Sequence, residues 1–174
     1  MFNKFILVLM LMLAATSSRA QEGRKPEISD TVQWRTVSEY ERDRELIIKC
    51  LRWLCTAPMG QDVIYRSEAN AFVLRWLAGS PSVIIDIDET IFDFTEENDE
   101  MLFSVIHAMA LTTMTKKREL DKEKLAVETL KIVCELVESS EKYSADKKLK
   151  TALKAYRRDK LEEYVKERAT GSTK

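Results

Sequence analysis

The second half of the chain contains neither glycine nor proline, since none occurs from residue 82 to residue 170. Because these two residues interrupt helices most strongly, this stretch can form long helices with few obligatory breaks. Apolar residues recur there at the three- and four-residue spacing of a buried helix face. We therefore predict helices at about residues 98–117, 121–138 and 145–167.

Two further helices are predicted in the first half of the chain. Ser38 and Glu41 have the spacing of a capping box, in which side chains at a helix start satisfy free backbone N–H groups. A helix should follow to about Thr56. A second should cover about residues 62–78, where Gly79 ends it.

Both of these helices end in the pattern Leu-Arg-Trp-Leu, three further residues and proline, at residues 51–58 and 74–81. A pattern shared by two amphipathic helices predicts that they use the same residue in the same way. We expect Trp53 and Trp76 to be largely buried, at equivalent places near the two helix ends.

The best candidate for a strand is the β-branched run Val83 to Ile87. Residues 91–94 are a second short candidate that could complete a hairpin. The predicted fold is therefore mainly α, with about five helices and a short β-strand or hairpin near residues 83–94. The predicted organisation is a signal peptide at residues 1–20, an N-terminal arm at 21–37, a single helical domain at 38–168 and a tail at 169–174.

Residues 1–20 have the pattern of a secretory signal peptide. Lys4 precedes an uncharged apolar run at residues 5–15, and Ser18 and Ala20 place small residues before a cleavage site. That run is shorter than the ~20 residues a membrane-spanning helix needs. We predict cleavage after Ala20, export to the periplasm or the extracellular space, and no transmembrane segment after cleavage.

Export would place the three cysteines in a compartment where disulfides persist. Cys50 and Cys55 should face apart on one helix, so they should not pair with each other. Pairing of Cys134 with either of them is compatible with the sequence, as is burial of all three as small apolar residues, which we favour. A zinc site that adds His107 would lack a second closely spaced ligand pair, so no metal is assigned.

The 28 basic and 29 acidic residues give no reason to expect nucleic acid as a partner. The charges are nevertheless segregated along the chain. No lysine or arginine lies between Trp76 and Thr115, a stretch rich in aspartate and glutamate, whereas residues 147–160 hold seven basic residues and one acidic residue. We interpret the two segments as solvated faces that complement each other within the molecule.

One short segment has the pattern of a catalytic motif. Residues 83–91 contain three apolar residues followed by Asp86, Asp88 and Thr90 at alternate positions. The segment resembles the first motif of haloacid-dehalogenase-type phosphatases. The resemblance implies Asp86 as the nucleophile that takes the phosphoryl group, Asp88 as the general acid and base, and a bound Mg²⁺.

The rest of the chain does not fit that family. Its fold alternates strands and helices around a parallel sheet, whereas the residues after Thr90 are predicted to be helical almost throughout. The family's closing acidic motif is also missing. A Mg²⁺-dependent phosphohydrolase that uses Asp86 and Asp88 is therefore the alternative, and the leading interpretation assigns no catalytic, cofactor-binding or metal-binding residue.

A second resemblance covers more of the chain. The residues that carry it are 70–72, Leu74, Trp76, 79–83 and 161–165. They are similar to a group of small secreted helical proteins from Gram-negative bacteria related to Bacteroides. The resemblance implies an exported helical protein and does not imply an enzymatic activity. We therefore predict a non-catalytic interaction or structural protein of the cell envelope, and a protein partner is compatible with this role.

Overall fold

The computed structural model describes residues 24–171 except positions 30, 97, 117–119 and 142. The predicted signal peptide at residues 1–20 lies outside the described residues, as do the last positions of the predicted tail. The described residues form the helices α2 (Val37–Thr56), α3 (Val63–Gly79), α4 (Asp99–Thr115), α5 (Lys122–Glu138), α6 (Lys147–Arg157) and α7 (Leu161–Ala169), and the short 3₁₀ helix η1 (Asp93–Thr95). The predicted mainly α fold is confirmed.

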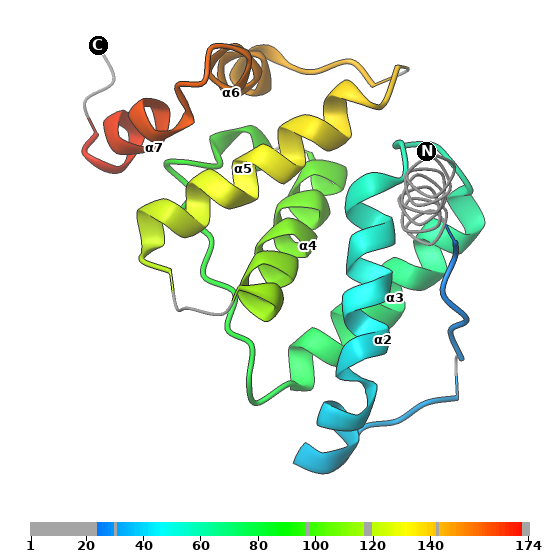
Figure 1. The fold of residues 1–174 in the computed structure, drawn as a ribbon. Coiled ribbons are helices and arrows are strands. Elements are labelled where there is room, and N and C mark those ends of the chain that lie inside the picture. Colours follow the sequence, from blue (N-terminus) through cyan, green and yellow to red (C-terminus); the bar gives the residue numbers. More distant parts are fainter. Residues whose placement is uncertain (1–23, 30, 97, 117–119, 142, 172–174) are drawn as a thin grey trace, which may run out of the picture.

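Helix α4 lies at the centre of the molecule, between α2 and α5 (Figure 1). Its first half, including Met101 and Val105, is buried in a core shared with α5, α6, α7 and η1. Its second half contributes Ala110 and Met114 to another core, shared with α2 and α3. The two cores are thus joined through one apolar helix, which explains why the described part of the chain packs as one body.

The start of α2 differs from the prediction by two residues. Thr36, rather than Ser38, is the N-cap, and Glu39 completes the capping box. The Glu39 carboxylate accepts hydrogen bonds from the backbone N–H groups of Arg35 at 2.7 Å and Thr36 at 2.9 Å. The same Ser/Thr-x-x-Glu spacing occurs at both registers, and the register that forms lies next to the anchored side chain of Trp34.

The segment before α2 packs against the core shared by α2, α3 and the second half of α4 instead of extending away from it. The Trp34 indole N–H donates to Asp43 at 2.7 Å, and its ring lies edge-on to Phe72 with centroids 5.2 Å apart. Further back, the Tyr65 hydroxyl donates to the carbonyl of Pro26 at 2.6 Å. These contacts hold the described part of the arm on α2 and α3.

The prediction for the paired tryptophans is confirmed. Trp53 is 2% exposed and Trp76 is 0% exposed, and each lies three residues before the last residue of its helix. Each ring has a T-shaped aromatic neighbour, Tyr65 for Trp53 and Tyr40 for Trp76. The repeated sequence pattern therefore marks two equivalent anchors.

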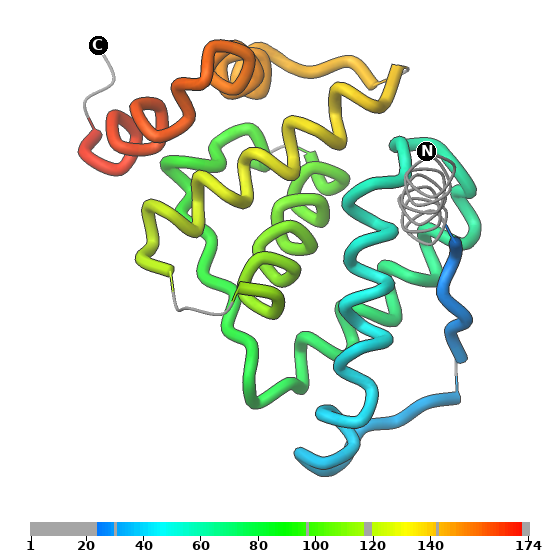
Figure 2. The backbone as a smooth tube through the Cα atoms, viewed as in Figure 1, coloured from blue at the N-terminus to red at the C-terminus, as the bar shows by residue number. Residues whose placement is uncertain are grey.

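The strand or hairpin predicted near residues 83–94 is wrong: the structure describes this segment in full, and no strand occurs there or elsewhere in the described residues. Burial does alternate, with Val83 buried and Ile84 exposed, as in a strand on a protein surface. However, a strand needs a neighbour for its backbone hydrogen bonds, and no second strand forms. Instead the connection runs beside α4 and turns back into it (Figure 2).

The second part of this segment folds locally. The carbonyl of Asp88 accepts from the backbone N–H groups of Ile91 and Phe92 at 3.1 and 3.0 Å, and η1 follows. Ile91, Phe92 and Phe94 are all buried beneath this turn. The apolar residues that suggested a hairpin strand are therefore buried by a turn and a short 3₁₀ helix.

The helix predicted at residues 145–167 is two helices, α6 and α7. The chain breaks at Asp159, whose φ of 56° is left-handed, and the N–H groups of Asp159 and Lys160 donate to carbonyls at the end of α6. This is a helix stop of the kind that glycine usually makes, although aspartate tolerates it at a small cost. The bend lets the buried residues Leu161 and Val165 of α7 pack on α5.

In the described part of the chain, no helix has both the length and the apolar character needed to cross a membrane.

Candidate functional site

Asp88, the second carboxylate of the motif-like segment, organises a turn. One of its oxygens accepts hydrogen bonds from the Thr90 hydroxyl at 2.6 Å and the Thr90 backbone N–H at 3.0 Å. The Thr90 hydroxyl bond is the main reason that the pKa of Asp88 lies below its usual range. A general acid must hold a proton near neutral pH, so this environment opposes the role that the phosphatase resemblance implies.

Asp86 lies in an open ion pair. Its carboxylate is 2.7 Å from the ammonium group of Lys122 at the start of α5, with 68% and 88% of the two side chains exposed. This partner could not be predicted from the sequence, because the two residues are 36 positions apart along the chain. A nucleophilic carboxylate acts from a pocket that excludes water and holds the phosphoryl group, whereas Asp86 faces solvent.

No described group of three or more histidine, cysteine, aspartate or glutamate side chains is placed to hold a metal ion. Within the described chain, Asp86 and Asp88 therefore have no third ligand beside them. Our leading interpretation, that the protein uses no metal or other cofactor, stays a prediction.

The three cysteines are buried in the helix cores and are free thiols. The favoured interpretation as buried apolar residues is confirmed, and no disulfide joins Cys134 to Cys50 or Cys55. Burial raises the pKa of each thiol to about 12. His107 is also buried, and desolvation lowers its pKa to about 3, with a smaller contribution from Arg66. These are inert interior groups, in contrast to reactive or metal-binding ones.

The acidic segment before α4 is neutralised by the C-terminal helices. Arg168 on α7 donates two hydrogen bonds to the Asp93 carboxylate, at 2.8 and 2.9 Å, and both side chains are mostly buried. Lys148 at the start of α6 is 2.5 Å from Glu96 and donates to the carbonyl of Asp93. The predicted complementarity of the acidic segment with residues 147–160 is seen at the contacts of Lys148, whereas Arg168 lies outside that segment.

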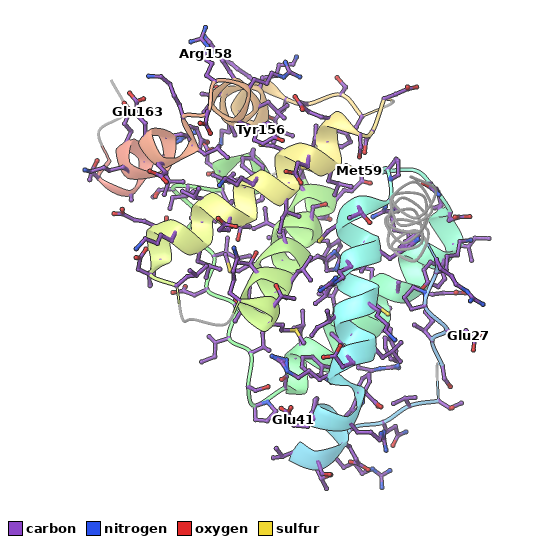
Figure 3. All side chains as sticks on the ribbon, in the orientation of Figure 1. Glu27, Glu41, Met59, Tyr156, Arg158 and Glu163 are labelled. Carbon is purple, nitrogen blue, oxygen red and sulfur yellow. The ribbon has the colours of Figure 1, made fainter. Side chains whose placement is uncertain are left out.

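One row of basic residues on α6 takes no part in that neutralisation. Lys147, Lys150, Lys154 and Arg158 are exposed, and their side chains make no ion pair or hydrogen bond within the described chain. At about 100° per residue they fall within an arc of about 80°. We call these four residues the basic face of α6. Arg158 projects outward from the molecule in Figure 3.

The opposite side of α6 is apolar. Leu149, Ala152 and Leu153 are buried against α5 and α7, and Tyr156 lies toward α5 (Figure 3). This packing fixes the orientation of the helix and holds the basic face toward solvent. The sequence showed the excess of positive charge. The spacing of three, four and four residues was the available signal for the row. Which of the seven basic residues pair with carboxylates of other elements depends on the fold.

A surface hollow of about 720 Å³ lies at the start of α5 and reaches α7. Its lining mixes four lysines with four carboxylates, and two of the lysines pair within it: Lys124 is 2.7 Å from Asp121, and Lys131 is 3.6 Å from Glu128. This hollow therefore presents charges of both signs in equal number. The basic face of α6 is therefore the better candidate for an interaction site.

Comparison of the chain with protein-family models, with curated proteins and with solved structures finds no match.

Proposed function

We propose that this protein is an exported, non-catalytic interaction protein of the cell envelope and that it acts through the basic face of α6. The signal-peptide pattern at residues 1–20 supports export. The resemblance to small secreted helical proteins of Bacteroides-related bacteria supports the same location. The observation that carries the proposal is that exposed basic residues without an ion pair gather on one side of a single short helix, with no acidic residue among them.

An unpaired row of this kind is costly to the folded protein. Like charges three or four residues apart on a helix repel by about 0.2–0.5 kcal/mol per pair, so the three successive pairs of the basic face oppose helix formation by about 1 kcal/mol. The helix dipole disfavours positive charge at Lys147 in the first turn of α6 and favours it at Lys154 in the last turn, so its penalty falls on Lys147. An anionic partner would remove both penalties, and this is what the row is suited to bind.

The alternative, a Mg²⁺-dependent phosphohydrolase that uses Asp86 and Asp88, has weaker support. The lowered pKa of Asp88 and the open ion pair of Asp86 both oppose the roles that the resemblance assigns. The row on α6 lies on a different element and would have no part in that chemistry.

Retention on isolated Gram-negative envelopes, with their peripheral proteins in place, tests the proposal. The wild-type protein should sediment with the envelopes at low salt and be released at about 1 M salt, where the Debye length is only about 3 Å. Replacing Lys147, Lys150 and Lys154 by glutamine should abolish retention.

The matched control removes three charges elsewhere. Arg24, Lys49 and Arg52 are exposed, and no ion pair of theirs occurs in the described chain, so their replacement by glutamine gives the same change of net charge. Retention should survive in this control. Equal retention of both triple variants would overturn the proposal.

A further inference from the structure

We infer that the partner of the basic face of α6 is the surface of an anionic phospholipid bilayer, an inference that rests on the proposed function and names its ligand. The headgroups would be contacted by the side chains of Lys147, Lys150, Lys154 and Arg158 together. The argument depends on the shape of this face, its composition and the charge of the remaining molecule.

The basic face is convex. It lies on the outer side of α6, which packs on α5, α7 and η1 through its opposite side. None of its four residues lines any of the surface hollows described for this protein. From Lys147 to Arg158 the row is about 16 Å long at 1.5 Å per residue. A convex row of this length can lie along a flat surface and contact several headgroups at once.

The composition of the face distinguishes a bilayer surface from a protein. Protein interfaces depend on a few aromatic or apolar side chains that enter pockets. Beside the basic residues the exposed side of α6 offers Thr151, and the large exposed apolar residues of the described chain lie on other elements. A headgroup layer needs no such anchor, because clustered lysines and arginines bind it by charge. The expected binding is peripheral and reversible by salt.

The rest of the molecule would orient it. Without residues 1–20, which hold two basic residues and no acidic one, the chain has 26 basic and 29 acidic residues and a net charge of −3. Next to α6, Asp146 caps its start and Asp159 lies at its end, while Glu138 is engaged by Arg157 at 2.6 Å. An anionic bilayer would repel most other faces, so contact through α6 is the favoured orientation.

The test is sedimentation with protein-free vesicles, using the exported protein purified with its N-terminus checked by intact mass. Wild type should bind vesicles of phosphatidylcholine mixed with phosphatidylglycerol and should not bind phosphatidylcholine alone. Each basic residue near an anionic surface changes partitioning about fivefold. The Lys147→Gln, Lys150→Gln, Lys154→Gln variant should therefore partition about 100-fold more weakly. The matched variant at Arg24, Lys49 and Arg52 should bind nearly as well as wild type.

The outcomes separate this inference from the proposed function. Retention on whole envelopes that depends on α6, without binding to phosphatidylglycerol vesicles, would overturn the lipid inference, point to an acidic protein or polysaccharide and leave the proposed function standing. If the wild-type protein neither stays on envelopes nor binds phosphatidylglycerol vesicles, both the lipid inference and the proposed function are overturned. Equal binding to both kinds of vesicle, or equal weakening by the two triple variants, would also overturn the inference. Circular dichroism of each variant confirms that its helices are intact.

Discussion

Arg66 at the start of α3 should stabilise the fold by ending α2. Its guanidinium group donates hydrogen bonds to the carbonyls of Leu54 at 3.1 Å, Ala57 at 2.5 Å and Pro58 at 3.2 Å, and it lies 5.2 Å from the centre of the Trp53 ring. The last carbonyls of a helix have no partner within the helix, so a cation from the next helix satisfies them and matches the helix dipole. The variant Arg66→Met keeps an apolar stem and removes every donor.

The expected loss of stability follows from these contacts. A hydrogen bond from a charged donor contributes about 1.5–3 kcal/mol net, but one guanidinium group serves all three carbonyls and water would reach some of them in the variant. We therefore expect a loss of about 3 kcal/mol in the free energy of unfolding. With a urea dependence of about 2 kcal/mol/M, the unfolding midpoint should fall by about 1.5 M.

Urea unfolding followed by tryptophan fluorescence measures this shift, and Arg75 provides the control. Arg75 is on the same helix and also lies over a tryptophan, 5.5 Å from the centre of the Trp34 ring, but no hydrogen bond of its guanidinium group is found in the described structure. Arg75→Met should cost less than about 1 kcal/mol. If the two variants lose the same free energy of unfolding, the hydrogen bonds of Arg66 to the end of α2 do not stabilise the fold as we infer.

Three further predictions concern groups that we interpret as non-catalytic. Asp86→Asn should change stability by less than about 0.5 kcal/mol and leave Mg²⁺-dependent hydrolysis of an aryl phosphate unchanged; magnesium-dependent turnover that this variant abolishes would establish the phosphohydrolase instead. The three cysteines should resist a thiol reagent in the native protein and react in urea, and rapid native labelling would contradict their burial. The pKa of His107 is lowered from 6.5 to about 3 by burial, so the unfolded chain binds a proton that the folded protein excludes. The contribution of His107 to the free energy of unfolding should be complete above about pH 6.5 and should fall toward pH 3 by up to about 1.4 kcal/mol per pH unit. Urea midpoints measured across this range should depend less steeply on pH in His107→Leu. An unchanged slope would show that His107 titrates normally.

Much of the helical fold could be predicted because it depends on local patterns. Apolar spacing located α4 and α5 to within a few residues, and the repeated pattern around Trp53 and Trp76 identified both tryptophans as buried anchors. These features depend on residues within one or two helical turns, which the sequence displays directly.

The errors arose where a long-range contact decides the outcome. The β-branched run at residues 83–87 has the propensity of a strand but no partner, and propensity alone does not supply backbone hydrogen bonds. The break between α6 and α7 at Asp159 contains no glycine or proline, and the chain turns there so that Leu161 at the start of α7 is buried. Contacts across the chain, such as Lys122 with Asp86, were not visible in the sequence for the same reason.

The candidate site combined both kinds of information. The excess of basic residues at 147–160 was evident from the sequence, but its division into paired and unpaired side chains depends on the fold. Lys148 and Arg157 face carboxylates of other elements, whereas the four residues of the basic face do not. The partners of Lys148 and Arg157 had to be known before the unpaired residues could be told apart from them.

Photo-crosslinking in living cells tests most directly whether α6 is the interaction face. Thr151 borders the basic face, is exposed, and can be replaced by a photoreactive side chain without removing any charge. Glu45, exposed on α2, is the control position. We predict adducts at position 151 and few at position 45, with the mass of a phospholipid if the lipid inference holds. Equal labelling at both positions, or labelling at position 45 alone, would contradict the assignment of the basic face as the interaction site.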